Sequence, residues 1–547
     1  MASLSSTGKY PSHPHLRNHS TWLSTGRANI NTLLGSVTWE AIEPREQGVF
    51  DFAGLDRVVL DARQHGLRLV LLWFGSYKNG MSTYVPRWVK TDHERFPRCQ
   101  VGQADGTRRT VEMVSPFSRE VREADARAFA ELMAHIRAID ERHGTVLMVQ
   151  VKNEPGLLGD SRDRSAVADD GFRKPIPELL LKHLSTSTTQ PAFRERFANI
   201  PDGGCHSWKD VFGQGTAANE AFMAYHMSTF VSEVAAAGRQ VYPLPMFVNA
   251  WLNADRTSYG ASLEKGEGEG GADAAAGAVS RAYSAGRYPS GGPVPHMLDI
   301  WRYSCADVLD FFSPDIYAGD YALCLQDYQS AHASNVLFVP EQRRDAYGCR
   351  RLWLAYASRA LGCSPFGIDT ADLGVVGREY RLLANIQHLL LTTRAEDRLG
   401  FFFDDADQPT QKSSAGGPCP GTWVRRFGSV EVCVKRAFVF GKPGSGGGMM
   451  IHLGGLRFFM AGYGFNVTFR DSSQKATFVG LLHVAEKHVQ ADGELATLRL
   501  LNGDETRAGS SVNMPNGAPD YGGHPVPVTI PARTGLAEVE VYMLYGK

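Results

Sequence analysis

The sequence predicts an α/β fold: a (β/α)8 TIM barrel followed by a C-terminal all-β, sandwich-like domain. Between residues 29 and 395, short and nearly continuous apolar runs alternate with helical stretches, which is typical of parallel strands covered on both faces. Beyond residue 400, apolar and polar residues alternate in short runs, as in half-buried antiparallel strands. The chain has 547 residues, more than one hydrophobic core usually supports. We therefore expect an irregular or truncated segment over 1–28, a barrel over 29–395 and a β domain over 400–547.

The apolar runs give the expected barrel strands in chain order. They lie at residues 30–34 and 36–39, then at 67–73, 146–151, 245–248, 308–312, 336–339 and just before Gly367. The clearest helix is expected over residues 118–139. Ser118 stands at its N-cap position, and apolar residues recur at helical spacing, namely Val121, Phe129, Leu132, Met133, Ile136 and Ile139.

Two long loops and a short front interrupt the expected barrel. The loops cover residues 156–215 and 253–295, and the second is rich in Gly and Ala. We interpret residues 15–20 as a remnant of the turn that a first strand carries, but too few residues separate them from Asn29 for a first helix of normal length. We therefore expect the first and eighth strands to close poorly. His13, His15 and His19 have no acidic residue or Cys nearby, so no metal site is expected there.

Composition limits the possible partners. The chain has 57 Lys and Arg against 58 Asp and Glu, a net charge of −1, so a strongly basic face for nucleic acid is not expected. No apolar run of about 18 residues predicts a membrane span. The start does not resemble a signal peptide, which makes a cytoplasmic location the default. The eight cysteines lie far apart without a CxxC pair, and we expect no metal and no cofactor. The oligomeric state stays open.

Two glutamates follow expected barrel strands. Glu154 comes after the fourth strand, and Glu341 comes after the seventh. Because function in such barrels collects at the carboxyl ends of strands, the two carboxyl groups can meet in one site. Cleavage of a glycosidic bond needs such a pair, one protonated to release the leaving group and one ionised to attack or to activate water. The structural alternative is a salt bridge for either glutamate.

Aromatic and amide side chains follow the same strands. Flat rings that could cover a sugar are contributed by Trp39, Trp73, Trp251 and Tyr317. The Tyr317 hydroxyl could also hold a nucleophilic carboxylate. Asn153 precedes Glu154 and could donate to a sugar hydroxyl beside the reacting carbon. For each tryptophan alone, core packing is the competing interpretation.

Several motifs resemble β-galactosidases of glycoside hydrolase families 35 and 42, and most closely a family-35-like subgroup with a C-terminal β domain. The resemblance covers about residues 29–545. The motifs are Trp39-Glu-Ala-Ile-Glu43-Pro44, Gly48-Val-Phe-Asp-Phe52, Leu71-Leu-Trp-Phe-Gly75, Lys78-Asn-Gly80, Tyr84-Val-Pro-Arg-Trp-Val89, Arg95-Phe-Pro-Arg98, Ser115-Pro-Phe-Ser118, Tyr288-Pro-Ser-Gly-Gly-Pro293 and Ser313-Pro-Asp-Ile-Tyr317.

The resemblance implies a role for each matching position. Glu154 would be the acid/base and Glu341 the nucleophile, with Asn153 at the sugar's 2-hydroxyl and Tyr317 bonded to the nucleophile. Pocket-lining roles are implied for Asn249, Trp251 and Asp369, and a site-shaping or ion-pair role is expected for Glu43.

The sequence thus predicts a retaining exo-glycosidase that hydrolyses terminal β-galactosides of an oligosaccharide or glycoside substrate. Two alternatives stay open. One is an inactive carbohydrate-binding relative with an incomplete barrel. The other is a retaining glycosidase for a β-glucoside, β-arabinoside or β-fucoside. Related proteins are often secreted, so the resemblance leaves the compartment undecided.

Overall fold

The computed structural model describes residues 2–3, 28–186, 190–253, 284–329, 335–370, 372–404, 421–439, 442–516 and 534–546. Within them the chain divides into two compact units. The first contains residues 1–319, 324–342 and 364–371, and the second contains 320–323, 343–363 and 372–547. Each unit is described by itself.

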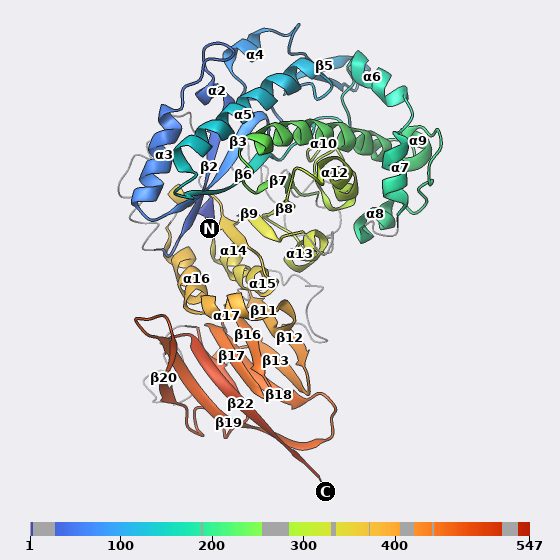
Figure 1. Ribbon diagram of the computed structural model, residues 1–547. Coiled ribbons are helices and arrows are strands. Elements are labelled where there is room, and N and C mark those ends of the chain that lie inside the picture. Colours follow the sequence, from blue (N-terminus) through green and yellow to red (C-terminus); the bar gives the residue numbers. More distant parts are fainter. Residues whose placement is uncertain are drawn as a thin grey trace. The chain divides into compact units, whose positions relative to one another are not determined.

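Eight strands of one sheet follow one another in chain order, and helices lie between consecutive strands from β2 to β10, which confirms the predicted (β/α)8 barrel (Figure 1). The pairs from β1 through β9 are parallel. The strands are β1 (Ala2–Ser3), β2 (Thr32–Thr38), β3 (Arg68–Lys78), β6 (Val146–Asn153), β7 (Met246–Trp251), β8 (Phe311–Ile316), β9 (Phe338–Gln342) and β10 (Gly362–Pro365).

Helices cover the outside of these strands, as Figure 1 shows for α3, α5 and α10. Helix α5 packs against α10, and α10 packs against α12. The helices are α2 (Trp39–Ile42), α3 (Ala53–Gln64), α4 (Arg87–Thr91), α5 (Arg119–Asp140), α10 (Thr216–Val241), α12 (Leu298–Cys305) and α13 (Tyr321–Gln329), with short 3-10 helices at η1 (Pro295–Met297) and η2 (Ile368–Thr370).

Helix α5 confirms the helix predicted over 118–139. The Ser118 hydroxyl accepts from the Val121 backbone N–H, which satisfies one of the free donors of the first turn. The buried face carries the predicted apolar residues, and it also carries one acidic residue, Asp125, whose side chain is fully buried.

The lower part of the barrel interior is apolar. Inward side chains from six strands pack together, namely Leu34, Val70, Leu72, Phe74, Met148, Phe247, Phe311 and Phe338. Phe247 and Phe311 stack with ring centroids 5.0 Å apart. Since side chains alternate along a strand, Asn249 and Trp251 continue the inward row above Phe247, and Ser313 and Asp315 continue the row above Phe311.

The segment predicted as a long loop over 156–215 contains four short helices. They are α6 (Ala166–Arg173), α7 (Glu178–Ser185), α8 (Pro191–Arg196) and α9 (Trp208–Phe212). A hairpin of β4 (Arg98–Gly102) and β5 (Arg108–Val114) is held against this segment. There Asp160 accepts from the Gly102 backbone and pairs with Arg164. Most of the second predicted loop, residues 254–283, lies outside the described residues.

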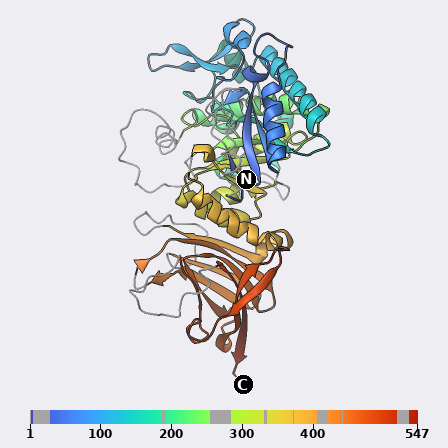
Figure 2. The same ribbon diagram turned by 90° about the vertical axis from the view of Figure 1, so that its left-hand side faces the viewer.

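The last strands form two antiparallel sheets, which confirms the predicted all-β character (Figure 2). The six-stranded sheet contains β11 (Arg398–Phe403), β16 (Gly446–Gly454), β17 (Arg457–Tyr463), β22 (Leu536–Tyr545), β19 (Ala476–Val489) and β20 (Leu495–Leu500). The four-stranded sheet contains β12 (Thr422–Phe427), β13 (Val430–Arg436), β18 (Phe465–Asp471) and β21 (Val512–Met514), and a small ribbon pairs β14 (Phe438–Val439) with β15 (Lys442–Pro443).

Aromatic rings join the two sheets. Phe458 of β17 contacts Phe427 of β12 and Phe469 of β18, with ring centroids 5.8 and 5.3 Å apart. Phe401 of β11 contacts Phe465 of β18 at 4.7 Å. Apolar faces of two sheets packed in this way give the sandwich-like core.

The second unit also contains helices that precede the strands. They are α14 (Ala346–Arg350), α15 (Leu352–Ala357), α16 (Gly374–Asn385) and α17 (Gln387–Thr392), followed by the 3-10 helix η3 (Ala395–Asp397). Within this unit, Glu379 of α16 accepts from the Trp353 ring N–H of α15 and from the Tyr463 hydroxyl of β17. These contacts do not test the predicted domain boundary near residues 395–400, which stays a prediction.

At the front, the backbone of Ala2 and Ser3 runs parallel to β2, beside Leu33 and Leu34. Residues 4–27 lie outside the described residues. They include His13, His15 and His19, the turn remnant expected at 15–20 and most of the predicted irregular segment. Across the described part of the chain, none of the helices has the length and apolarity needed to cross a bilayer.

Candidate active site

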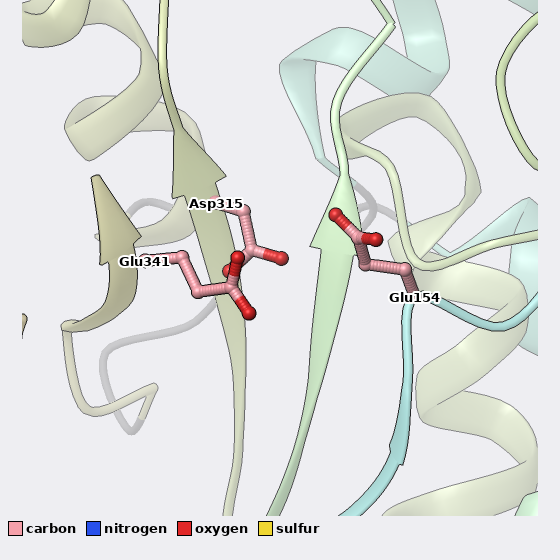
Figure 3. A group of neighbouring side chains, drawn as sticks. All are labelled: Glu154, Asp315 and Glu341. Atoms are coloured by element: carbon pink, nitrogen blue, oxygen red, sulfur yellow. The ribbon is translucent and has the colours of Figure 1, made fainter. Parts of the chain in front are cut away.

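Three carboxyl groups meet at the carboxyl ends of the barrel strands. Glu154 follows β6, Asp315 lies in β8 and Glu341 lies in β9. One carboxylate oxygen from each lies within 4.8 Å of the others, and Figure 3 shows the three groups pointing toward one another. We call these three residues the three-carboxyl cluster. Glu154 and Asp315 are buried, and Glu341 is partly exposed.

The backbone at the end of β6 turns Glu154 toward the cluster. Lys152 and Glu154 have φ angles of 71° and 47°, in the left-handed region that side chains other than Gly seldom adopt. Such strained residues persist only where the surroundings hold them, and they gather at functional sites. The Glu154 backbone N–H donates to Asn249 Oδ1 at 2.8 Å, which fixes the turn from the neighbouring strand.

Lys152 is held from outside the strands. Its Nζ lies 2.6 Å from both carboxylate oxygens of Asp125 in α5, and both side chains are fully buried. The Trp73 ring N–H and the Ser76 backbone N–H donate to the same carboxylate, at 2.9 and 2.8 Å. Burial lowers the pKa of Lys152 to about 8, against the opposing effect of Asp125. We call Lys152 and Asp125 the anchoring ion pair.

Amide side chains connect the cluster to β3. Asn249 Nδ2 donates to Asp315 Oδ2 at 2.6 Å and to Asn153 Oδ1 at 3.3 Å. Asn153 Nδ2 donates to Asn79 Oδ1 at 2.9 Å, and Lys78 Nζ donates to the same oxygen at 2.8 Å. This chain of amides fixes the orientations of Asn153 and Asn249 and brings a positive charge next to the carboxyl groups.

Tyr317 follows β8 and contacts Glu341. Its hydroxyl donates to Glu341 Oε2 at 2.7 Å. The hydrogen bond favours the ionised form of Glu341, as does the charge of Lys78, while burial opposes both and leaves the pKa of Glu341 raised. Burial also raises the pKa of Tyr317 well above its ordinary value, so its hydroxyl keeps its proton and acts as a donor.

The cluster separates the proton affinities of the three carboxyl groups. Burial and then the charge of Glu341 raise the pKa of Glu154 to about 7. Burial and the charges of Glu341 and Glu154 raise the pKa of Asp315 well above its ordinary value. A protonated and an ionised carboxyl group can therefore coexist within 4.8 Å near neutral pH, which is the arrangement that acid/base work on one bond requires.

Of the other predicted site residues, two are half-buried at strand ends and two are fully buried. Trp251, half-buried, ends β7 beside Asp315 in the sheet register, and Asp369 is half-buried in η2 after β10. Trp39 and Trp73 are fully buried, and their ring N–H groups donate to Glu43 and Asp125. This corrects the expectation that these two rings cover a sugar, because neither has an exposed face.

Glu43 follows α2, the short helix after β2. Its side chain is fully buried and accepts from the Trp39 ring N–H at 2.6 Å and from the Gly48 backbone. Burial raises its pKa. These contacts hold the turn after β2, and the site-shaping role expected for Glu43 stays a prediction.

The sequence interpretation missed Asp315, Lys78 and Asn79. All three lie inside motifs that carry the family resemblance, Ser313-Pro-Asp-Ile-Tyr317 and Lys78-Asn-Gly80. Position is the signal that could have found Asp315, because it ends an apolar strand, as Glu154 and Glu341 do.

Among the described residues, the three-carboxyl cluster is also the group that could hold a metal ion. Asp315 Oδ2 and Glu341 Oε2 already accept from Asn249 and Tyr317, and Lys78 brings a positive charge close to Glu154 and Glu341. Because these oxygens already accept hydrogen bonds and a positive charge lies nearby, the cluster is better suited to exchange protons than to bind a cation.

Two family models match parts of the chain. Residues 20–180 match a family described as β-galactosidase, a segment that includes Glu154 and the turn at the end of β6. Residues 376–513 match a domain of unknown function, DUF5597. The first match, to the model of glycoside hydrolase family 42, supports a β-galactosidase-like glycoside hydrolase, and the expected resemblance to family 35 stays a prediction. No curated protein sequence matches the chain.

Solved structures include two similar proteins. A β-galactosidase from Bacillus circulans sp. alkalophilus aligns with a TM-score of 0.45 and 13% identity, over 70% of this chain and 56% of that one. A β-galactosidase from the psychrophilic Marinomonas ef1 aligns with a TM-score of 0.42 and 14% identity, over 69% of this chain and 59% of that one. This chain thus covers less than two thirds of the length of either protein.

Proposed function

We propose that the protein is a retaining exo-glycosidase that hydrolyses terminal β-galactosides. The observation that carries the proposal is the meeting of Glu154 and Glu341, with oxygens within 4.8 Å, from the ends of two distant strands. Retaining glycosidases use two carboxyl groups about 5–5.5 Å apart, whereas inverting enzymes need room for a water between them. The β-galactosidase family match over 20–180 supports the choice of sugar.

In the first step, the ionised Glu341 attacks the anomeric carbon and forms a bond to it. The bond from that carbon to the leaving oxygen breaks, and Glu154 gives its proton to that oxygen. In the second step, Glu154 takes a proton from water, the water oxygen bonds to the anomeric carbon, and Glu341 departs as a carboxylate. Tyr317 stabilises the ionised Glu341 through its 2.7 Å hydrogen bond.

The test compares Glu341→Gln and Glu154→Gln on two aryl β-galactosides, one with a good and one with a poor leaving group. Glu341→Gln should abolish turnover of both, because no carboxylate remains to attack. Glu154→Gln should lose about 10²- to 10⁴-fold on the poor leaving group and much less in the first step on the good one, which needs little protonation. Glu120→Gln, with an exposed side chain in α5, is the matched control.

Other β-sugars and pure binding are outcomes of the same experiment. Faster turnover of an aryl β-glucoside, β-arabinoside or β-fucoside would keep the chemistry and change the sugar, because a few side chains read one hydroxyl. Binding of galactose without turnover of any glycoside would indicate the inactive relative. Turnover by Glu341→Gln at the wild-type rate would remove the assignment of the nucleophile.

A further inference from the structure

Asp315 is a third carboxyl group beside the proposed pair, and the two-carboxylate reaction does not use it. Its side chain is 4% exposed. Oδ2 accepts from Asn249 at 2.6 Å, and the carboxyl group also shares a hydrogen bond with Glu154. Oδ1 receives no hydrogen bond from any donor in the described part of the chain. A buried, ionised oxygen without a donor is costly, so this position favours a proton.

The surrounding charges point the same way. Among the described residues, the groups that act on the cluster include Lys78 from β3 and Tyr317, whose hydroxyl keeps its proton because burial raises its pKa. Tyr328 of α13 also interacts with Asp315, but its hydroxyl donates to the Pro293 backbone oxygen at 2.7 Å. Within the described part of the chain, three ionised carboxyl groups within 4.8 Å would therefore have one positive charge, that of Lys78, acting on them. Like charges at this distance cannot all stay ionised in a buried site, so the cluster retains at least one proton.

The contacts decide which residue holds that proton. Glu341 receives the Tyr317 hydroxyl and has Lys78 nearby, and both favour its ionised form. A proton on Asp315 would make its carboxyl group a donor, and Glu154, with which it shares a hydrogen bond, supplies the acceptor. Oδ1, the oxygen without a donor, would then carry no unsatisfied negative charge. Asn249 Nδ2 meanwhile continues to donate to Oδ2.

We propose that Asp315 is a positioning residue that keeps its proton through the reaction cycle and donates it in a hydrogen bond to Glu154. Its role in turnover rests on the proposed glycosidase function, whereas its retention of a proton does not. The hydrogen bond would hold the Glu154 carboxyl group in one orientation. It would also stabilise the carboxylate that Glu154 becomes after it protonates the leaving group.

Two variants of similar shape separate this role from simple packing. Asp315→Asn keeps an oxygen for Asn249 and an N–H for Glu154. It should retain at least about a tenth of the wild-type kcat/KM, with the alkaline limb of the pH profile in place. Asp315→Leu removes the donor. It should lose about 10- to 100-fold and move the alkaline limb upward by about one pH unit, because the ionised Glu154 loses its hydrogen bond.

The opposite outcome is equally defined. If Asp315 were ionised in the working enzyme, Asp315→Asn would remove a negative charge beside Glu154, and the alkaline limb would move downward. That shift, or a loss in Asp315→Asn equal to the loss in Asp315→Leu, would overturn the proposal.

A measurement without substrate keeps the inference separate from the proposed function. At about pH 9, above the pKa of Glu154, infrared spectra of the wild-type protein should retain a band from a protonated carboxylic acid. Asp315→Asn should lack this band, and Glu120→Gln should retain it. Absence of the band in the wild-type protein would overturn the proposal even if hydrolysis is observed, and its presence would support the proposal even if no glycoside is cleaved.

Discussion

Glu154 shows how a single carboxyl group can be kept ready to give up a proton. Most glutamates lose their proton at an acidic pH and are ionised at neutral pH. Burial and the charge of Glu341 raise the pKa of Glu154 to about 7. An acid that donates to a leaving group must start protonated, so its active form is present below that pKa and is lost above it.

This gives a pH dependence for the wild-type protein. We expect kcat/KM for an aryl β-galactoside to fall as the pH rises through about 7, because Glu154 loses its proton. On the acid side the rate should fall where Glu341 becomes protonated, and the raised pKa of Glu341 places that limb above the usual range of glutamate. A steady-state pH profile measures both limbs. A rate that stays constant to pH values well above 7 would contradict the assignment of Glu154 as the acid.

The electrostatic coupling can be measured without turnover. In Glu341→Gln the neighbouring negative charge is gone, so the pKa of Glu154 should decrease relative to the wild-type protein. Titration of side-chain carboxyl carbons by NMR, with Glu154→Gln to assign the signal, checks this direction. An unchanged pKa in Glu341→Gln would mean that the charge of Glu341 does not contribute to the raised pKa of Glu154.

At the scale of the residue, the sequence predicted the glutamate pair and the Tyr317 contact, because the strand-end rule depends only on apolar runs and on the residues directly after them. The roles of these residues remain proposals. The rule did not separate Trp251, at the end of its strand beside Asp315, from Trp39 and Trp73, which are buried. That difference depends on which face of the chain meets a helix, and an uninterrupted apolar run does not contain this information.

The end of β6 shows how one element positions another. The positive φ angles at Lys152 and Glu154 break the regular alternation of the strand, and the anchoring ion pair holds Lys152 against α5. Gly75 of β3 makes room for this pair. A Cβ at residue 75 would lie 2.6 Å from Asp125 Oδ1 and would also clash with Lys152 Nζ.

Gly75→Ala should therefore destabilise the protein by about 1–3 kcal/mol, because the extra carbon forces apart buried groups. It should also lower kcat, since the ion pair holds the backbone that carries Glu154. Gly35→Ala in β2 is the matched control, because a Cβ there meets nothing within 4 Å. Denaturant unfolding and kcat measure the two effects. Equal stability of both variants would show that the pair adapts without cost.

Among the elements, the parallel strands followed from their nearly continuous apolar runs and α5 followed from its helical periodicity, whereas the four helices within 156–215 were not predicted. Helices α8 and α9 have six and five residues, too few for an apolar period to emerge. The hairpin of β4 and β5 was missed for a related reason. Its β5 strand is largely exposed, with buried residues only at its end, so it lacks the apolar alternation that marks a strand.

At the scale of the whole molecule, the sequence changes from nearly continuous apolar runs to alternating apolar and polar residues. This contrast was sufficient to predict the barrel and the β domain. The boundary between the barrel and the β domain that the sequence predicts stays a prediction. The second unit depends on buried charge as well as on its sheets. Asp404 accepts from Arg350 and Arg351, and all three side chains are at most 5% exposed.

Loss of this buried pairing should be costly. Asp404→Asn would remove the carboxylate that two buried guanidinium groups share, and we expect a destabilisation of about 3–5 kcal/mol. Glu396→Gln removes the partner of Arg394 in an ion pair whose side chains are largely exposed, and it should change Tm little. Thermal unfolding compares the two variants. Similar Tm values would contradict a structural role for Asp404.

The anchoring ion pair has a practical consequence for anyone who alters this protein. Asp125 lies on a helix behind the strands and touches none of the three clustered carboxyl groups through a described hydrogen bond, yet it restrains the turn that carries Glu154. Libraries confined to side chains that face the sugar would omit it. Randomising Asp125 together with Lys152 would instead change the orientation of the Glu154 carboxyl group, while every residue in reach of the substrate kept its chemical identity.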